Sequence, residues 1–114
     1  MTTNDILDHH LKCFGTRDLE GILGDYAPDA VMFCPDGIRK GPDARKDFFV
    51  KLLAEFSKPG ASMSMQQTFV EGDYAYIVWT AESAGNKYLM ATDTFVIRDG
   101  KIVAQSFAAK VESK

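Results

Sequence analysis

The hydrophobic pattern of this chain changes period once, and that change limits the folds open to it. Up to about residue 60 the apolar residues recur at helical spacing, and beyond it they alternate as in β-strands between turn residues. A chain of 114 residues with 46% hydrophobic residues and a net charge of −3 has the composition of one globular domain, here residues 1–114. We therefore expect an α+β fold in which helices pack on one antiparallel sheet.

The first part of the chain predicts three helices and one short strand. The helices are expected over about residues 4–14, 18–27 and 41–57, and the strand over residues 30–34. Tyr26 and Ala27 are expected to end the second helix, before a turn at Pro28–Asp29. Pro42 suits the first turn of the third helix, where its missing N–H costs nothing.

The second part predicts four strands joined by hairpin turns. The strands are expected over residues 62–71, 74–83, 88–98 and 101–111, and the turns at Gly72–Asp73, Gly85–Asn86 and Asp99–Gly100. The expected order is therefore α-α-β-α-β-β-β-β. A strongly bent sheet wrapped around the long third helix would enclose a cavity.

Several classes of function are not expected. No apolar run approaches the roughly 20 residues that span a bilayer, and the first ten residues carry no basic residue, so we expect a cytoplasmic protein with no membrane partner. A mildly acidic chain lacks the charge of a nucleic-acid binder. Cys13 and Cys34 are expected to be reduced, and the adjacent His9 and His10 lack zinc-ligand spacing. We expect no metal and no organic cofactor.

Four segments resemble the nuclear transport factor two-like superfamily, and within it the SnoaL-like and ketosteroid isomerase-like proteins. They read RDLEGIL followed by YAPDAV, GPDA followed by FF, ATDTF, and RDGKI. The resemblance implies a cystatin-like fold, in which a cone-shaped curved antiparallel sheet wraps around helices, and a homodimer formed through the sheet. Because this fold carries isomerases, cyclases and non-catalytic binding domains, function has to be argued from the site.

The resemblance also implies a candidate catalytic set. Ketosteroid isomerase uses a carboxylate base and an oxyanion hole made by a tyrosine and a protonated aspartic acid. By position, the aspartic acid falls on Asp93, the base on Cys34 and the tyrosine on His10. Because the base is not kept as a carboxylate, a true steroid isomerase is not expected. Asp36, two residues after Cys34, could replace the base.

Each of these residues also has a structural interpretation. His10 could be a core histidine, Cys34 a buried filler and Asp36 a turn residue in Pro-Asp-Gly. Asp93 could be paired with the neighbouring backbone or with Arg98. A buried, unpaired carboxylate costs several kcal/mol, so burial would raise the pKa of Asp93 and make it an acid or a hydrogen-bond donor. A nucleophilic Cys34 would require a nearby base that stabilises its thiolate, and His10 could be that base only if the fold brings the two residues together.

The candidate ligand-binding residues lie on the strands and the third helix. The resemblance places Gln105 and Phe107 of the last strand toward the cavity. Tyr76 and Trp79 lie on opposite faces of their strand, and the sequence does not tell which face lines the pocket. Phe49 is the candidate from the third helix. The pairs Arg39–Lys40 and Arg45–Lys46 are expected to be solvated.

Three functions remain open. The first is an isomerase- or cyclase-type enzyme that uses acid–base chemistry on a small apolar molecule with a carbonyl group. The second is a pocket that binds a small hydrophobic molecule without chemistry. The third is a dimerisation module whose cavity is filled by its own phenylalanines, which are Phe48, Phe49, Phe56, Phe69 and Phe107.

Overall fold

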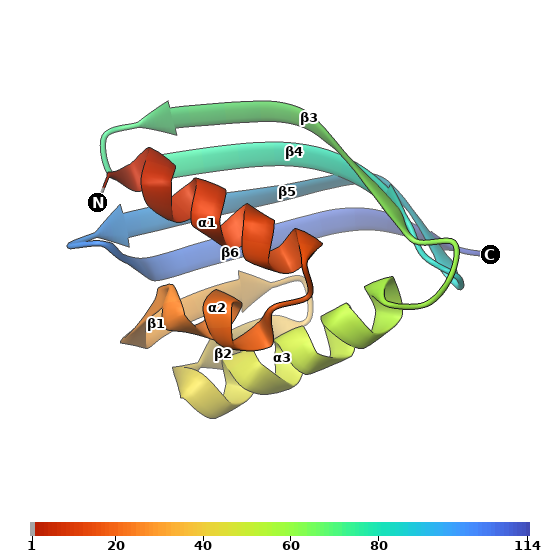
Figure 1. Ribbon diagram of the computed structural model, residues 1–114, viewed down its shortest axis with the longest axis horizontal. Helices are drawn as coiled ribbons and strands as arrows, with labels where there is room; N and C mark the ends of the chain where they lie inside the picture. The colour runs from red at the N-terminus through yellow and green to blue at the C-terminus, as the bar shows by residue number, and fades with distance from the viewer. Residues whose placement is uncertain (1) are drawn as a thin grey trace.

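The computed structural model describes residues 2–114, which form three helices and six strands (Figure 1). The helices are α1 (Thr3–Gly15), α2 (Leu19–Gly24) and α3 (Gly41–Phe56). The strands are β1 (Tyr26–Cys34), β2 (Gly37–Lys40), β3 (Ser62–Glu71), β4 (Tyr74–Glu82), β5 (Asn86–Arg98) and β6 (Lys101–Ser113). None of the helices that these residues form is long and apolar enough to span a membrane.

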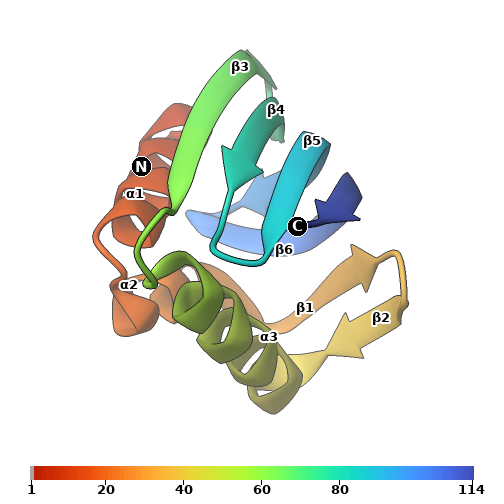
Figure 2. The ribbon, with the colours of Figure 1, turned by 90° about the vertical axis from the view of Figure 1, so that its right-hand side faces the viewer.

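The strands form one curved sheet in the order β2-β1-β6-β5-β4-β3. Figure 2 shows β3 to β6 arching over one side of the molecule, with α1 and α3 inside the curve. This confirms the predicted α+β class, with helices enclosed by a bent sheet. One pairing differs from the antiparallel pattern, because β1 runs parallel to β6.

The helices begin where the capping residues predict. The Thr2 hydroxyl accepts a hydrogen bond from the Asp5 backbone N–H at 3.1 Å, and the Asp5 carboxylate accepts one from the Thr2 N–H at 3.0 Å. The Asp18 carboxylate accepts from the Gly21 N–H at 3.0 Å and caps α2. Pro42 lies in the first turn of α3, as expected.

The prediction for the start of β1 is wrong. Tyr26 and Ala27 belong to the strand rather than to the end of a helix, and Pro28–Asp29 is not a separate turn. The strand tolerates Pro28 because the register with β6 shifts between Tyr26 and Val31, so no regular ladder hydrogen bond is required there.

Strand β2 was not expected, because the sequence predicts a turn at Pro-Asp-Gly and a solvated pair at Arg39–Lys40 in this segment. Gly37–Lys40 pairs back on β1 across the turn at Pro35–Asp36, with Cys34 opposite Gly37. The segment is a short edge strand with Ile38 exposed, so it has no buried face to mark it in the sequence.

The four C-terminal strands are confirmed, but some of their ends differ from the prediction. Strand β5 begins at Asn86, which was expected in the turn, and β6 runs two residues further than expected, to Ser113. Their alternation separates an inner from an outer face. On β4, Ala75, Ile77 and Trp79 are buried, whereas Tyr74 and Tyr76 are exposed. The inner face therefore packs toward the helices and defines the interior.

Arg45 also differs from the prediction, because its side chain is buried rather than solvated. Its guanidinium donates to the backbone oxygens of Ala30 at 3.0 Å, Ala27 at 3.2 Å and Pro28 at 3.4 Å. These carbonyls belong to the irregular part of β1, so one side chain of α3 satisfies the groups that the shifted register leaves free.

Candidate functional site

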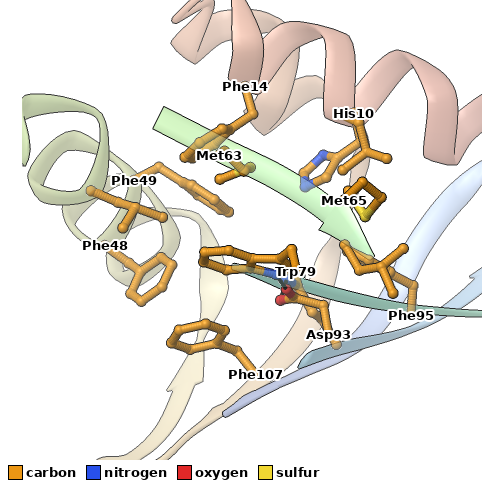
Figure 3. Close-up of a pocket in the computed structure, with 14 residues that line it drawn as sticks. His10, Phe14, Phe48, Phe49, Met63, Met65, Trp79, Asp93, Phe95 and Phe107 are labelled. Carbon is orange, nitrogen blue, oxygen red and sulfur yellow. Dashed lines mark hydrogen bonds between the residues drawn. The ribbon is translucent and has the colours of Figure 1, made fainter. Parts of the chain in front are cut away.

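A pocket opens between α1, α3 and the inner face of the sheet (Figure 3). The cavity has a volume of about 60 Å³ and is open to solvent at its mouth. Its walls are mostly apolar and aromatic, with polar side chains from three residues. The lining residues are His10, Leu11, Phe14, Phe48, Phe49, Leu52, Met63, Met65, Ile77, Trp79, Asp93, Phe95, Gln105 and Phe107.

Asp93 lies on the inner face of β5 and is held by two donors. The Trp79 indole N–H donates to Oδ2 at 2.8 Å, and the Gln105 amide donates to Oδ1 at 2.9 Å. Burial raises the pKa of the Asp93 carboxyl, although both hydrogen bonds and the nearby His10 act in the opposite direction. The pairing with Arg98 that the sequence left open does not occur. Asp93 is therefore a buried acid inside an apolar pocket.

His10 faces the pocket from α1 and is connected to Asp93 by hydrogen bonds. Its Nε2 lies 3.5 Å from the hydroxyl of Tyr26, which hydrogen-bonds the Gln105 amide oxygen. The same Gln105 donates to Asp93. On its other side, Nδ1 of His10 lies 3.2 Å from the Asp25 carboxylate. His10 and Asp93 thus belong to one buried polar network at one end of the pocket.

The sequence interpretation missed two members of this network, Asp25 and Tyr26. The prediction placed Tyr26 at the end of a helix. If the strand is started at Tyr26 instead, strand alternation puts Tyr26 on the same face as Ala30 and Met32, and all three are buried in the structure. Burial, together with the charge of Asp93, raises the pKa of Tyr26 well above its usual value, so Tyr26 keeps its proton and remains a donor.

Cys34 and Asp36, the two candidates for the missing base, do not line the pocket. Cys34 is half-buried on β1, and burial raises the pKa of its thiol, which disfavours a thiolate. Asp36 is exposed in the turn after β1 and pairs with Arg39 at 3.1 Å. The ring nitrogens of His10 face Asp25 and Tyr26 instead of the Cys34 sulfur. Cys13 and Cys34 are both free thiols.

Four of the five predicted ligand-binding residues line the pocket. They are Phe49, Trp79, Gln105 and Phe107, and the rings of Trp79 and Phe107 stack at 6.2 Å. Tyr76 is the exception, because it lies on the outer face of β4 and points away from the pocket. Of the five phenylalanines expected to fill the cavity, Phe48, Phe49 and Phe107 line it, whereas Phe69 is exposed on the outer face of the sheet. Within residues 2–114, no three side chains of metal-binding types come together as a metal site.

The raised pKa of Asp93 predicts how stability depends on pH. The ordinary pKa of this carboxyl is 3.8, so in the unfolded chain Asp93 loses its proton as the pH rises through that value. In the native protein Asp93 keeps its proton to a higher pH, because its pKa is raised. The native state then binds more protons, so the free energy of unfolding falls as the pH rises from there to the raised native pKa. The Asp93→Asn variant lacks this proton.

We therefore expect wild type to be more stable than Asp93→Asn by a margin that shrinks as the pH rises. Urea unfolding of both proteins between about pH 4 and pH 8 measures that margin. A margin that stays constant, or that grows toward neutral pH, would contradict the raised pKa.

Comparison with known families agrees with this architecture. A SnoaL-like domain matches residues 7–105, so the chain belongs to the SnoaL-like family. No curated protein matches the chain.

Solved structures show the same fold at low sequence identity. An NTF2-like protein of unknown function from Cytophaga hutchinsonii is 14% identical, with a TM-score of 0.79, and the match covers 96% of this chain and 91% of the other. A polyketide cyclase assigned as putative, from Sinorhizobium meliloti, is 22% identical, with a TM-score of 0.77 and coverage of 91% and 94%. A ketosteroid isomerase, also assigned as putative, from Kribbella flavida is 13% identical, with a TM-score of 0.78 and coverage of 95% and 77%. These likenesses define an NTF2-like fold.

Proposed function

We propose that this protein is an acid–base enzyme that acts on a small, largely apolar molecule with a carbonyl group, as isomerases and cyclases do. The observation that carries the proposal is the position of Asp93, a buried carboxyl with a raised pKa among aromatic walls. A protonated carboxyl in such a place donates a hydrogen bond to a carbonyl oxygen, and that bond strengthens as negative charge develops on the oxygen.

The second catalytic group in this proposal is His10. It lines the same pocket and is joined to Asp93 through Tyr26 and Gln105. With the carbonyl oxygen at Asp93, His10 would move a proton at the carbon next to the carbonyl, while the aromatic rings exclude water. The presence of a cyclase and an isomerase among proteins of this fold supports the same class of chemistry.

The experiment uses β-tetralone, a flat bicyclic ketone, as the probe. In deuterated water the protein should catalyse the uptake of deuterium next to the carbonyl, as followed by proton NMR, well above the rate in buffer. The Asp36→Asn variant is the matched control, because Asp36 lies in an exposed turn outside the pocket. Uptake at the buffer rate despite demonstrated binding of the ketone would sink the enzymatic proposal.

A non-catalytic ligand-binding module is the alternative. It is favoured by the fact that Asp93 and Gln105 already have hydrogen-bond partners within the protein, as a structural network would. In that case β-tetralone or a similar ketone would raise the melting temperature and be recovered without deuterium.

We also propose that the protein forms a homodimer through the outer face of the sheet. One row of uncharged side chains crosses all six strands in register, and it comprises Ile38, Phe33, Ser106, Thr94, Tyr76 and Phe69. Phe69 and Ile38, at the two ends of the row, are 58% and 61% exposed. An uncharged row that exposes apolar side chains such as Ile38, Phe33 and Phe69 is typical of an interaction surface, and a second copy would cover it with a like row.

Light scattering tests this proposal. We expect a mass of twice 12.6 kDa for wild type and a shift toward the monomer for Tyr76→Lys. The matched control is Tyr74→Lys, on the same face but in a neighbouring row that ends in the charged residue Glu71. A monomeric wild type at micromolar concentration would rule the dimer out.

A further inference from the structure

The proposed function needs a base, and neither Cys34 nor Asp36 lies in the pocket to provide one. We infer that His10 is that base, held by Asp25 in the tautomer whose Nε2 accepts a proton from the ligand, with Asp25 in turn fastened by His9. This inference rests on the proposed function for its substrate class. The tautomer itself rests on the geometry alone.

The Asp25 carboxylate lies between two imidazole rings. Its Oδ1 is 2.7 Å from Nδ1 of His9, and its Oδ2 is 3.2 Å from Nδ1 of His10. Within residues 2–114, these two histidines are its ion-pair partners, and no lysine or arginine pairs with it. An ionised carboxylate only accepts hydrogen bonds, so both facing Nδ1 atoms carry protons. In its neutral form, His10 is therefore left with a lone pair on Nε2.

The hydrogen bonds near Nε2 of His10, which involve Tyr26 and Gln105, do not supply a proton to its lone pair. Tyr26 has one hydroxyl proton, which it gives to the Gln105 amide oxygen, because the Gln105 amide N–H groups face Asp93. The Tyr26 hydroxyl, 3.5 Å from Nε2 of His10, is then an acceptor toward the ring rather than a donor. His10 thus lines the pocket with a lone pair on Nε2 that receives no proton from the protein.

This arrangement also stabilises the ring once it has taken a proton. When Nε2 removes a proton from the carbon next to the carbonyl, the C–H electrons form the C=C bond of an enolate, and its negatively charged oxygen accepts a hydrogen bond from the Asp93 carboxyl. The positive ring lies beside the Asp25 carboxylate, with Nδ1 of His10 3.2 Å from Oδ2. This proton, or a deuteron that has replaced it by exchange with the solvent, then returns to a ligand carbon, which restores the ketone and the neutral ring.

Asp25 is placed by the backbone as well as by His9. It is the C-terminal cap of α2, where its N–H bonds to the carbonyl oxygens of Ile22 and Leu23, and its own carbonyl accepts from the Ile102 N–H at 2.8 Å. His9 is half-exposed on the solvent side and occupies the second carboxylate oxygen. Oδ2 is therefore turned toward His10, which makes Asp25 and His9 positioning residues.

The test combines the tautomer with the rate of deuterium uptake by β-tetralone. NMR of the imidazole nitrogens should show neutral His10 protonated at Nδ1 in wild type, and this preference should be lost in Asp25→Asn, whose amide presents a donor to one ring. Uptake should fall by about 10²–10⁴-fold in His10→Gln and about 10–100-fold in Asp25→Asn. Asp25→Glu should recover part of the rate. The control is Asp8→Asn, an exposed acid on the same helix, which should match wild type.

The outcomes separate this inference from the proposed function. If neutral His10 in wild type carries its proton on Nε2, or if His10→Gln exchanges at the wild-type rate, the inference is wrong. If Asp25→Asn does not fold, the tautomer of His10 in wild type and the rate of deuterium uptake in His10→Gln still test the inference. If wild type shows the Nδ1 proton but no uptake of deuterium, the proposed enzyme fails, while the positioning of His10 by Asp25 stands.

Discussion

The Asp93→Ala variant is expected to take up deuterium into β-tetralone about 10²–10³-fold more slowly than wild type, the usual loss when one donor to a developing oxyanion is removed. Asp93 is the one carboxyl that lines the pocket, and its raised pKa keeps it protonated further toward neutral pH than an exposed aspartate. Without it, the enolate oxygen would have no acid in this part of the site.

The loss has to be separated from misfolding, because alanine leaves the Trp79 and Gln105 N–H groups without their carboxylate partner. Asp93→Asn, which keeps an acceptor oxygen, serves as the second variant and should also be slow, since an amide N–H is a weaker donor to a developing negative charge than a carboxylic acid O–H. The Asp36→Ala variant should exchange like wild type. Wild-type rates in both folded Asp93 variants would show that Asp93 is a structural residue.

Replacing Arg45 by methionine is expected to lower the free energy of unfolding by about 3 kcal/mol, because buried acceptors lose charged donors. The Arg45 guanidinium donates hydrogen bonds to the backbone oxygens of Ala27, Pro28 and Ala30. It also lies 5.2 Å from the centre of the Tyr26 ring. Methionine fills part of the space but donates no hydrogen bond. The start of β1, which carries Tyr26, should therefore loosen.

Lys46→Met is the matched control, since Lys46 is adjacent in sequence but exposed, and a surface change of this kind alters stability by about 0.5 kcal/mol or less. Urea unfolding measures both variants. Equal stability of the two would mean that the Arg45 hydrogen bonds contribute little to the fold. In Arg45→Met we also expect faster amide exchange at the start of β1 than in Lys46→Met.

Most of the fold could be predicted because its signals are local. The turns at Gly72–Asp73 and Asp99–Gly100 fix two hairpins, and β3 has the predicted ends. The parallel pairing of β1 with β6 could not be read in this way. It joins segments about 70 residues apart, and tertiary packing alone selects it.

Arg45 shows where a local interpretation failed although the pattern held a clue. Phe49, Leu53 and Phe56 form the buried side of α3, and Arg45 lies one turn before Phe49 on that same side. The helical period predicts that Arg45 is buried, whereas its charge and the adjacent Lys46 predict that it is solvated. The prediction followed the charge and was wrong. The backbone oxygens that accept its hydrogen bonds belong to β1, so the sequence near Arg45 does not indicate that a buried guanidinium would have acceptors.

Only those residues of the candidate site that have a local signal in the sequence were predicted. Asp93 stands out as a charged residue within an alternating apolar strand, and His10 as a polar residue on an apolar helical face. Asp25 and Tyr26 were missed because they follow a short helix and precede Pro28, a context that reads as a turn. Their role depends on contacts with α1 and β6, which the chain order does not reveal.

The most direct measurement is carbon NMR of β-tetralone labelled at its carbonyl and bound to the protein. A hydrogen bond from the Asp93 carboxyl should polarise the carbonyl and move its resonance downfield relative to the free ketone, and the Asp93→Ala complex should lose that shift. The same carbonyl resonance in the wild-type and Asp93→Ala complexes would mean that Asp93 does not contact the ligand oxygen, and would contradict the account.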